Sequence, residues 1–284
     1  MKEGRPSTTA AWVAGLRGLA STRNDAIIDD HIAEQLLPAP YRQILATARK
    51  FPRAFSAVHA FADLATGGRS QHLPLRTRAI DDAVWRAVDD GARQLVVLGA
   101  GLDARAWRLD VLKDVVVFEV DHPTMQAYKR PRVEALPKAA REVRFVTSDF
   151  EREDLASRLD QAGFDPKVKS VYVWEGVTMY LSKEAIAMAV RGMASRSAPG
   201  SMLVATYFLE SERDRALDVV ALRWLLAQVS EPITVTMTPQ SFAALLSSHG
   251  FEVVADEGDP EWTERYLGGI QPWTLERLVT ARKR

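Results

Sequence analysis

The sequence predicts an α/β fold in which helices cover both faces of a seven-stranded, mostly parallel sheet. Short β-branched apolar runs alternate with amphipathic segments, as expected for repeated βα units. The first run, residues 95–98, stops at Gly99-Ala100-Gly101, and an amphipathic segment follows at once. Of the 284 residues, 47% are hydrophobic and 26% are charged, which allows one large core with appendages.

The order of the elements follows from these runs and from the turn residues between them. Strands are expected at residues 95–98, 115–118, 143–147, 171–174, 202–207 and 251–255, with a last, antiparallel strand at 273–281. Helices are expected at 75–88, 123–136 (broken by Pro131), 182–196 and 238–250. The main domain is therefore predicted at 75–284, with a helical lid inserted at about 208–235.

Residues 1–74 are predicted to form a helical N-terminal cap. Its first helix should begin at Ser7 or Thr8 as N-cap, with Trp12, Leu16 and Leu19 on one face. This cap lies before the sheet and is expected to act as an appendage of the main domain.

Two acidic residues end the second apolar run. Glu119 and Asp121 lie 20 and 22 residues beyond Gly99. A carboxylate at a strand end can accept hydrogen bonds from ribose hydroxyls, while Gly99 and Gly101 allow a sharp turn and the close approach of a ligand. The spacing therefore predicts a nucleotide-type cofactor site with Asp121 on the ribose and Glu119 as the alternative.

The third glycine of the dinucleotide-binding pattern is missing. Leu102, Asp103 and Ala104 occupy its place, and an acid there would repel a pyrophosphate. A ligand that carries a sulfonium and an ammonium suits this turn better. S-adenosylmethionine is therefore the expected cofactor, and a nicotinamide oxidoreductase is the less favoured alternative.

Four ordered motifs carry a family resemblance: LGAGLDARAWRL, FEVDHP, VTSDF and WEGVTMYL. Together they resemble the leucine carboxyl methyltransferase family, in its bacterial branch of S-adenosylmethionine-dependent methyltransferases, which includes polyketide carboxyl O-methyltransferases. The resemblance implies a Rossmann-like class I methyltransferase fold. It covers about residues 76–207.

The resemblance also implies roles for individual residues. Arg76 matches the arginine that, in the family, binds the methionyl carboxylate of the cofactor, and Arg78 is the alternative. Both could instead be solvent-exposed basic residues at the start of a helix. Glu175 corresponds to a cofactor-site glutamate near the positive end of the ligand. Asp149 and Phe150 should contact the adenine, although Asp149 could instead cap the next helix. The remaining cofactor candidates are Gly99, Ala100, Gly101, Asp121 and His122.

The methyl acceptor is the least defined part of the prediction. A small, natural-product-like acid methylated on its carboxylate is expected, because no clear general base is present and a carboxylate is already ionised. A hydroxyl or phenol acceptor would need a base, for which His72 or Tyr180 are candidates. Tyr180 is the candidate catalytic residue, and the aromatic pocket candidates are Phe55, Phe61, Tyr180, Tyr207 and Trp224. These aromatic residues could instead serve only in core packing. For the protein as a whole, a non-catalytic cofactor-binding role remains an alternative.

Composition narrows the possible partners. Lys+Arg and Asp+Glu both number 37, so the formal net charge is zero and no nucleic-acid or membrane partner is expected. The sequence has no cysteine, and its five histidines are scattered, so no metal site is predicted. Arg17 interrupts the only early apolar run, so neither a signal peptide nor a spanning helix is expected, and the protein should be cytoplasmic. The expected partner is a small-molecule acceptor.

Overall fold

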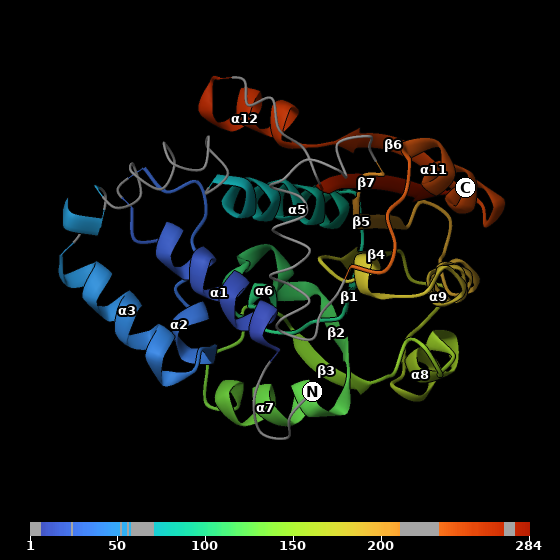
Figure 1. Ribbon diagram of the computed structural model, residues 1–284. Helices are drawn as coiled ribbons and strands as arrows, with labels where there is room; N and C mark the ends of the chain where they lie inside the picture. The colour runs from blue at the N-terminus through green and yellow to red at the C-terminus, as the bar shows by residue number, and fades with distance from the viewer. Residues whose placement is uncertain are drawn as a thin grey trace.

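A seven-stranded sheet forms the centre of the computed structural model (Figure 1), which describes residues 7–23, 25–51, 53–55, 57, 71–210, 233–269 and 276–284. The strands are β1 (Gln94–Leu98), β2 (Val116–Asp121), β3 (Glu142–Thr147), β4 (Ser170–Trp174), β5 (Met202–Phe208), β6 (Phe251–Glu257) and β7 (Glu276–Lys283). Their order is β3-β2-β1-β4-β5-β7-β6. Neighbouring strands from β3 to β5 are parallel, and β7 runs antiparallel to both β5 and β6. The predicted α/β fold class is confirmed.

The central strands are apolar throughout because both faces of the sheet are covered. All five residues of β1 are buried. Leu95 and Val97 pack into one hydrophobic cluster, whereas Val96 and Leu98 pack into the other, as the two-residue period of a strand requires. Each cluster fills the space between one face of the sheet and its helices.

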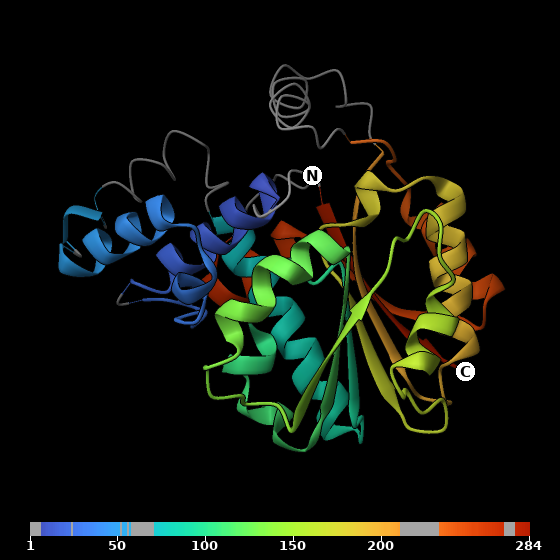
Figure 2. The same ribbon diagram turned by 90° about the horizontal axis from the view of Figure 1, so that it is seen from below.

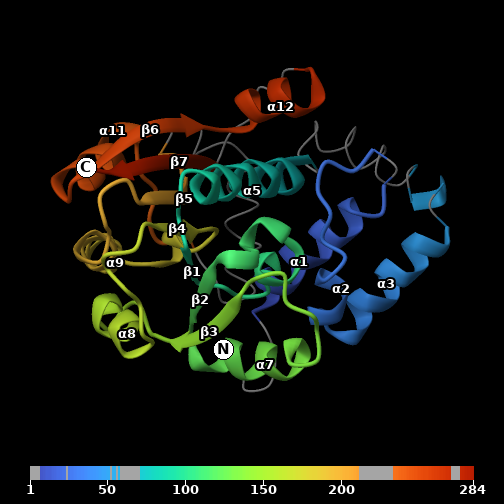
Figure 3. The same ribbon diagram turned by 180° about the vertical axis from the view of Figure 1, so that it is seen from behind.

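Two layers of helices enclose the sheet (Figures 2 and 3). On one side lie α1 (Thr8–Ala20), α2 (Ala33–Leu36), α3 (Ala39–Lys50), α5 (His72–Asp89), α6 (Arg105–Arg108), α7 (Pro123–Val133) and α12 (Asp259–Leu267). On the other side lie α8 (Leu155–Gln161), α9 (Lys183–Ser195) and α11 (Pro239–Ser248). Ser182 and Thr238 cap α9 and α11, because their side chains accept hydrogen bonds from backbone amides of the first turn. Within the described ranges, no helix is both long and apolar enough to cross a bilayer.

The first N-terminal helix, α1, packs against its neighbours mainly through small residues. Ser7 is the N-cap of α1, as expected. Trp12, however, is 49% exposed, and the buried face of α1 consists instead of Ala11, Ala14, Arg17, Gly18 and Ala20. Small side chains let α1 approach its neighbours closely, since a Cβ on Gly18 would lie 2.7 Å from Leu45 Cδ1.

One predicted helix differs from the structure, and most of the predicted lid is not described by it. Pro131 does not break α7 but lies in its last turn, and the helix ends at Val133 rather than Leu136. A proline near the end of a helix removes one backbone hydrogen bond, and α7 continues for only two more residues. The greater part of the predicted lid, residues 211–232, lies outside the described residues.

Candidate functional site

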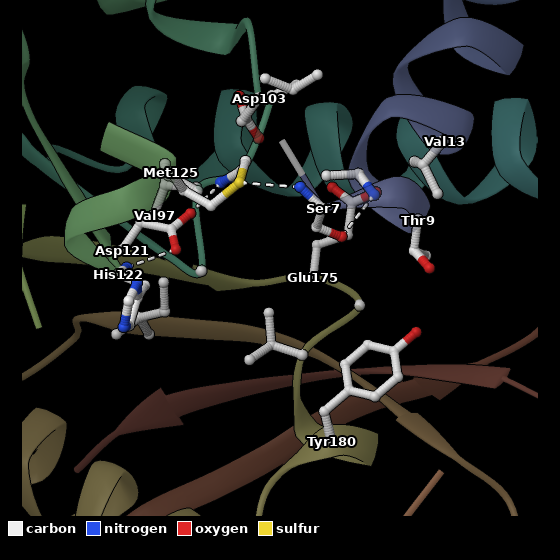
Figure 4. Close-up of a pocket in the computed structure, with 18 of the residues that line it drawn as sticks. Ser7, Thr9, Val13, Val97, Asp103, Asp121, His122, Met125, Glu175 and Tyr180 are labelled. Carbon is white, nitrogen blue, oxygen red and sulfur yellow. Dashed lines mark hydrogen bonds between the residues drawn. The ribbon is translucent and has the colours of Figure 1, made fainter. Parts of the chain in front are cut away.

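A pocket of about 420 Å³ lies at the carboxyl ends of β1, β2 and β4. This is the edge at which open α/β sheets bind ligands. The pocket brings together all nine cofactor candidates: Arg76, Gly99, Ala100, Gly101, Asp121, His122, Asp149, Phe150 and Glu175. Figure 4 shows how several of its lining side chains surround the space, with Asp121 and His122 at one side of the view and Tyr180 at another.

The glycine turn after β1 forms the floor of the pocket. Gly99 and Gly101 have φ values of 64° and 47°, which residues other than glycine rarely adopt. The amide of Gly101 donates to Asp121 Oδ2, and the amide of His122 donates to Asp121 Oδ1 over 2.6 Å. Asp121 is therefore fixed against the turn, with burial raising its pKa and these two hydrogen bonds opposing that effect.

Glu119, the alternative to Asp121, lies away from the pocket. It is 1% exposed, and its Oε1 accepts a hydrogen bond of 2.7 Å from Lys129 Nζ. Burial is the largest influence on its pKa, which rises to about 7 although Lys129 lowers it. Glu119 and Asp121 point to the same face of β2, but Glu119 lies two residues inside the buried strand and pairs with Lys129 of α7, whereas Asp121 ends the strand and reaches the edge.

Asp149 and Phe150 line the pocket just after β3. Asp149 does not cap the following helix, because Asp154 caps α8 by accepting from the amide of Ser157. Instead, Asp149 Oδ1 accepts a hydrogen bond of 3.1 Å from the amide of Glu151 within the turn. The structure thus decides against the helix-cap alternative.

Arg76, and not Arg78, reaches the pocket. Arg76 is 5% exposed, and its Nε and Nη2 donate to Glu175 Oε1 over 3.1 and 2.8 Å. Arg78 lies on the outer side of α5, where it pairs with Asp82. The two arginines are two residues apart on one helix and therefore point to different sides.

Eleven side chains form a continuous, largely buried series of ion pairs behind the pocket. Among the residues that the structure describes they are, in order along the series, Arg17, Asp30, Arg108, Asp81, Arg105, Asp103, Glu175, Arg76, Glu276, His72 and Asp259. Asp103 and Glu175 are not paired with each other, since both pair with Arg105. Five bases thus face six carboxylates when His72 is protonated. Isolated buried charges are strongly unfavourable, so each member depends on its neighbours.

The guanidinium groups of this series favour the ionised form of Glu175. Burial alone would raise the pKa of this carboxylate, but Arg105 and Arg76 outweigh burial and hold it below its usual range. Arg105 similarly keeps the pKa of Asp103 low. Both carboxylates line the pocket and are negatively charged at neutral pH.

The aromatic residues predicted to line the acceptor pocket fall into three groups. Tyr180 lines the pocket from the short helix η3 (Thr178–Tyr180). Tyr207 does not: it is fully buried under the sheet's second helix layer, and its hydroxyl donates to Asp256 Oδ2 over 2.7 Å. Phe55 is described but is absent from the pocket lining, whereas Phe61 and Trp224 lie outside the described residues.

The first helix contributes residues to the pocket that no sequence motif indicates. Ser7, Thr9, Ala10, Val13 and Arg17 all line the pocket from the beginning and the inner face of α1. These positions carry no motif, and only their packing against the glycine turn brings them to the site. One signal was present: Arg17 interrupts an apolar run, and a charge at such a position needs a buried partner.

The stability of the fold should decrease as the pH rises through the pKa of His72. Burial alone lowers that pKa, but hydrogen bonds with Asp259 and Glu276 outweigh burial and raise it to about 9. The folded pKa lies above the unfolded value, so the contribution of roughly 3 kcal/mol is complete below about pH 6.5 and is lost towards pH 9 and above. Urea unfolding at about pH 6 and about pH 10 measures this loss. His72→Gln should remove most of the difference, and the same difference in the variant would assign it to another group.

Comparisons with known proteins agree with the motifs. A family model described as leucine carboxyl methyltransferase matches residues 10–194. A Mycobacterium avium protein is 38% identical over 205 residues, which are 70% of this chain and 65% of that protein, so the chain spans just under two thirds of this relative. A Streptomyces coelicolor protein is 33% identical over 248 residues, 86% of this chain and 80% of that protein. Both carry the provisional name S-adenosyl-L-methionine-dependent methyltransferase.

Solved structures share the fold at low sequence identity. A DUF574 family protein from Streptomyces avermitilis superposes with a TM-score of 0.63 at 16% identity and covers 99% of both chains. A Thermobifida fusca protein, provisionally named a methyltransferase, has a TM-score of 0.57 at 18% identity and covers 81% of this chain and 88% of that chain. These similarities concern the fold.

Proposed function

The chain belongs to the leucine carboxyl methyltransferase family, and from this premise we propose that it is an S-adenosylmethionine-dependent O-methyltransferase. Its acceptor is a small, natural-product-like acid, which it methylates on a carboxylate. One observation carries the cofactor part of the proposal: among the described residues that line the pocket, four carboxylates and two guanidinium groups surround a glycine turn. They are Asp103, Asp121, Asp149, Glu175, Arg17 and Arg76.

The charges of the pocket fit this cofactor better than a dinucleotide. S-adenosylmethionine carries a sulfonium, an ammonium and a single carboxylate. Both the pocket and the ion-pair series behind it have an excess of carboxylates, which favours a cationic ligand and disfavours a pyrophosphate. Arg76 would hold the cofactor carboxylate, Asp121 the ribose, and Asp149 with Phe150 the adenine.

The chain's own contribution to catalysis is alignment and the exclusion of water. In methyl transfer the acceptor oxygen forms a bond to the methyl carbon as the carbon–sulfur bond breaks, and S-adenosylhomocysteine leaves. An in-line displacement of this kind needs the two reactants to be oriented and shielded from water, and the residues that line the pocket would provide this. A carboxylate acceptor is ionised at neutral pH, so the reaction needs no general base.

A hydroxyl or phenol acceptor is the second candidate function. Of the two possible bases, Tyr180 lines the pocket, whereas His72 lies outside it and has both ring nitrogens hydrogen-bonded to carboxylates. This arrangement argues against His72 as a base, so Tyr180 is the one remaining candidate of the two, which weakens the case for an acceptor that must lose a proton. We therefore prefer the carboxylate acceptor.

Two experiments test the proposal in sequence. Isothermal titration should detect S-adenosylhomocysteine binding and no comparable binding of NADH; the reverse result would favour an oxidoreductase. Purified protein with labelled S-adenosylmethionine and a panel of small acids should then yield methyl esters, which mild base hydrolyses. A base-stable product would indicate an ether and a hydroxyl acceptor, and binding with no transfer to any acceptor would favour a non-catalytic role.

Asp121→Ala should weaken the binding of S-adenosylhomocysteine by about 1–3 kcal/mol. The variant removes the proposed ribose acceptor and leaves the amides of Gly101 and His122 without their carboxylate partner. Titration calorimetry of the variant against the wild type measures the change. Asp114→Ala, at the exposed position just before the other end of β2, is the matched control and should leave the affinity unchanged. Equal affinity in Asp121→Ala would remove Asp121 from the proposed cofactor site.

The proposal includes a small-molecule acceptor, no nucleic-acid or membrane partner, and a cytoplasmic location. The zero formal net charge supports the absence of a nucleic-acid or anionic-membrane partner, because a neutral protein lacks the global field that attracts polyanions. Cell fractionation and a filter-binding assay with DNA and RNA test these points directly.

A further inference from the structure

Two carboxylates hold the guanidinium of Arg76: Glu175, which lines the pocket, and Glu276, which does not. Glu175 accepts from Nε and Nη2 of Arg76, as described above. On the other side, Nη1 donates to Glu276 Oε2 over 2.6 Å. Within the part of the chain that the structure describes, three of the five N–H groups of Arg76 are used in this way, which leaves two for a ligand carboxylate.

Glu276 reaches this position because β7 runs against the rest of the sheet. It is the first residue of β7 and pairs in register with Phe208, the last residue of β5. The beginning of the antiparallel strand therefore lies at the same edge as the carboxyl ends of the parallel strands. A residue 200 positions after Arg76 thus supports it from behind and is itself 2% exposed.

His72 holds Glu276 in turn. Its Nε2 lies 2.9 Å from Glu276 Oε2, and its Nδ1 lies 2.8 Å from Asp259 Oδ1 on α12. Ionised carboxylates only accept hydrogen bonds, so a ring between two of them must carry both protons. The elevated pKa of His72 agrees with a charged ring at neutral pH. Helices α5 and α12 and strand β7, which carry these residues, lie together in Figures 1 and 3.

We propose that Glu276 and His72 are positioning residues that aim the guanidinium of Arg76 at the carboxylate of the cofactor's amino-acid end. The inference rests on the proposed function, since it assumes that this ligand binds in the pocket. Glu276 balances the charge of Arg76 and fixes its plane, and the imidazolium of His72, anchored by Asp259, keeps Glu276 in place. Glu276 and Asp259 lie outside the residues that the family model matches, so the C-terminal part of this chain completes the cofactor site.

The test compares two ligands that differ in the part Arg76 would hold. S-adenosylhomocysteine contains the amino-acid end, whereas 5′-methylthioadenosine lacks it. In titrations with the full chain, Glu276→Gln should weaken S-adenosylhomocysteine about 10-fold and change 5′-methylthioadenosine less than about 2-fold. A merely structural role would weaken both ligands alike.

Two further variants make the result decisive. Glu257→Gln is the matched control, because Glu257 forms an ion pair with Arg265 between β6 and α12 and does not contact Arg76; it should leave the ratio of affinities at the wild-type value. His72→Gln keeps a hydrogen-bond donor near Glu276 but removes the charge, and it should lower the ratio in the same direction. If circular dichroism shows that Glu276→Gln does not fold, His72→Gln takes its place as the test variant.

Each outcome separates this inference from the proposed function. An unchanged ratio in a folded variant, an equal loss for both ligands, or unfolding of both variants would overturn the positioning role. Wild-type protein that binds both ligands equally would overturn it as well, because the amino-acid end would then not be recognised. Wild-type protein that binds neither ligand would instead refute the proposed function itself.

Discussion

Arg105→Met should lower the free energy of unfolding by about 3–5 kcal/mol. Arg105 is 2% exposed and contacts three carboxylates: its Nε donates to Asp81 over 2.7 Å, and its Nη1 contacts Asp103 and lies 2.8 Å from Glu175. Methionine is similar in length but leaves all three carboxylates without this cation in a buried setting. Urea unfolding monitored by circular dichroism measures the loss.

Arg196→Met is the matched control for this prediction. Arg196 also makes a two-pronged ion pair, with Asp160 at 2.7 and 2.6 Å, but both side chains are partly exposed. Solvent screens such a pair, so the cost should be below about 1 kcal/mol. Equal losses in the two variants would mean that burial does not set the importance of the Arg105 series.

The pH dependence of the Arg105 variant gives a second check. In the wild type, Glu175 and Asp103 have lowered pKa values, so their stabilising contribution is present above their unfolded pKa values and is lost as the pH falls through the folded ones. Without Arg105, these carboxylates should protonate more readily. The difference in stability between variant and wild type should therefore shrink as the pH is lowered towards about 4.

The fold, and which residues after the central strands line the pocket, could be predicted because their signals are local in the sequence. A buried parallel strand is an apolar run, and its carboxyl end is marked by the glycine or acid that follows it. Gly99, Asp121, Asp149 and Glu175 each follow or end such a run, and the topology of a parallel sheet then brings them to one edge. No knowledge of side-chain packing was needed for this step.

The ion-pair series could not be predicted because its partners are distant in sequence. Arg17 pairs with Asp30, but Arg105 pairs with Asp81 and Glu175, and Arg76 with Glu276. In the sequence these residues look like ordinary charges on amphipathic helices. Only the packing of α1, α5 and α6 against one another buries them, and burial is what makes their pairing necessary.

The error over Tyr207 has a similar cause. An aromatic residue near the end of β5 can face either layer of helices, and the sequence of a strand that is buried on both faces does not distinguish them. The structure places Tyr207 against Phe242, with ring centroids 5.0 Å apart, and gives its hydroxyl a partner in Asp256. Tyr180, in the short helix η3 that follows β4, does line the pocket, because the segments that leave the carboxyl ends of the strands meet at this edge.

Gly99→Ala should destabilise the protein by about 2–4 kcal/mol and also weaken S-adenosylhomocysteine binding. Gly99 has a φ of 64°, which strains any residue with a Cβ. The added Cβ would also lie 2.3 Å from Cγ2 of Val177. Val177 lines the pocket, so a movement of its side chain to relieve the overlap alters the space in which the cofactor is proposed to bind.

Two further variants separate backbone strain from the overlap. Gly101→Ala has a similar positive φ, but its Cβ would meet nothing closer than Ala10 Cβ at 3.5 Å, so it should cost only about 1 kcal/mol. Combining Gly99→Ala with Val177→Ala removes the overlap and keeps the strain, so stability should return towards that of Gly101→Ala after correction for Val177→Ala alone. Urea unfolding and titration calorimetry on the four variants measure both effects. If Gly99→Ala costs no more than Gly101→Ala, contact with Val177 is not what requires glycine at this position, and the backbone conformation alone is sufficient.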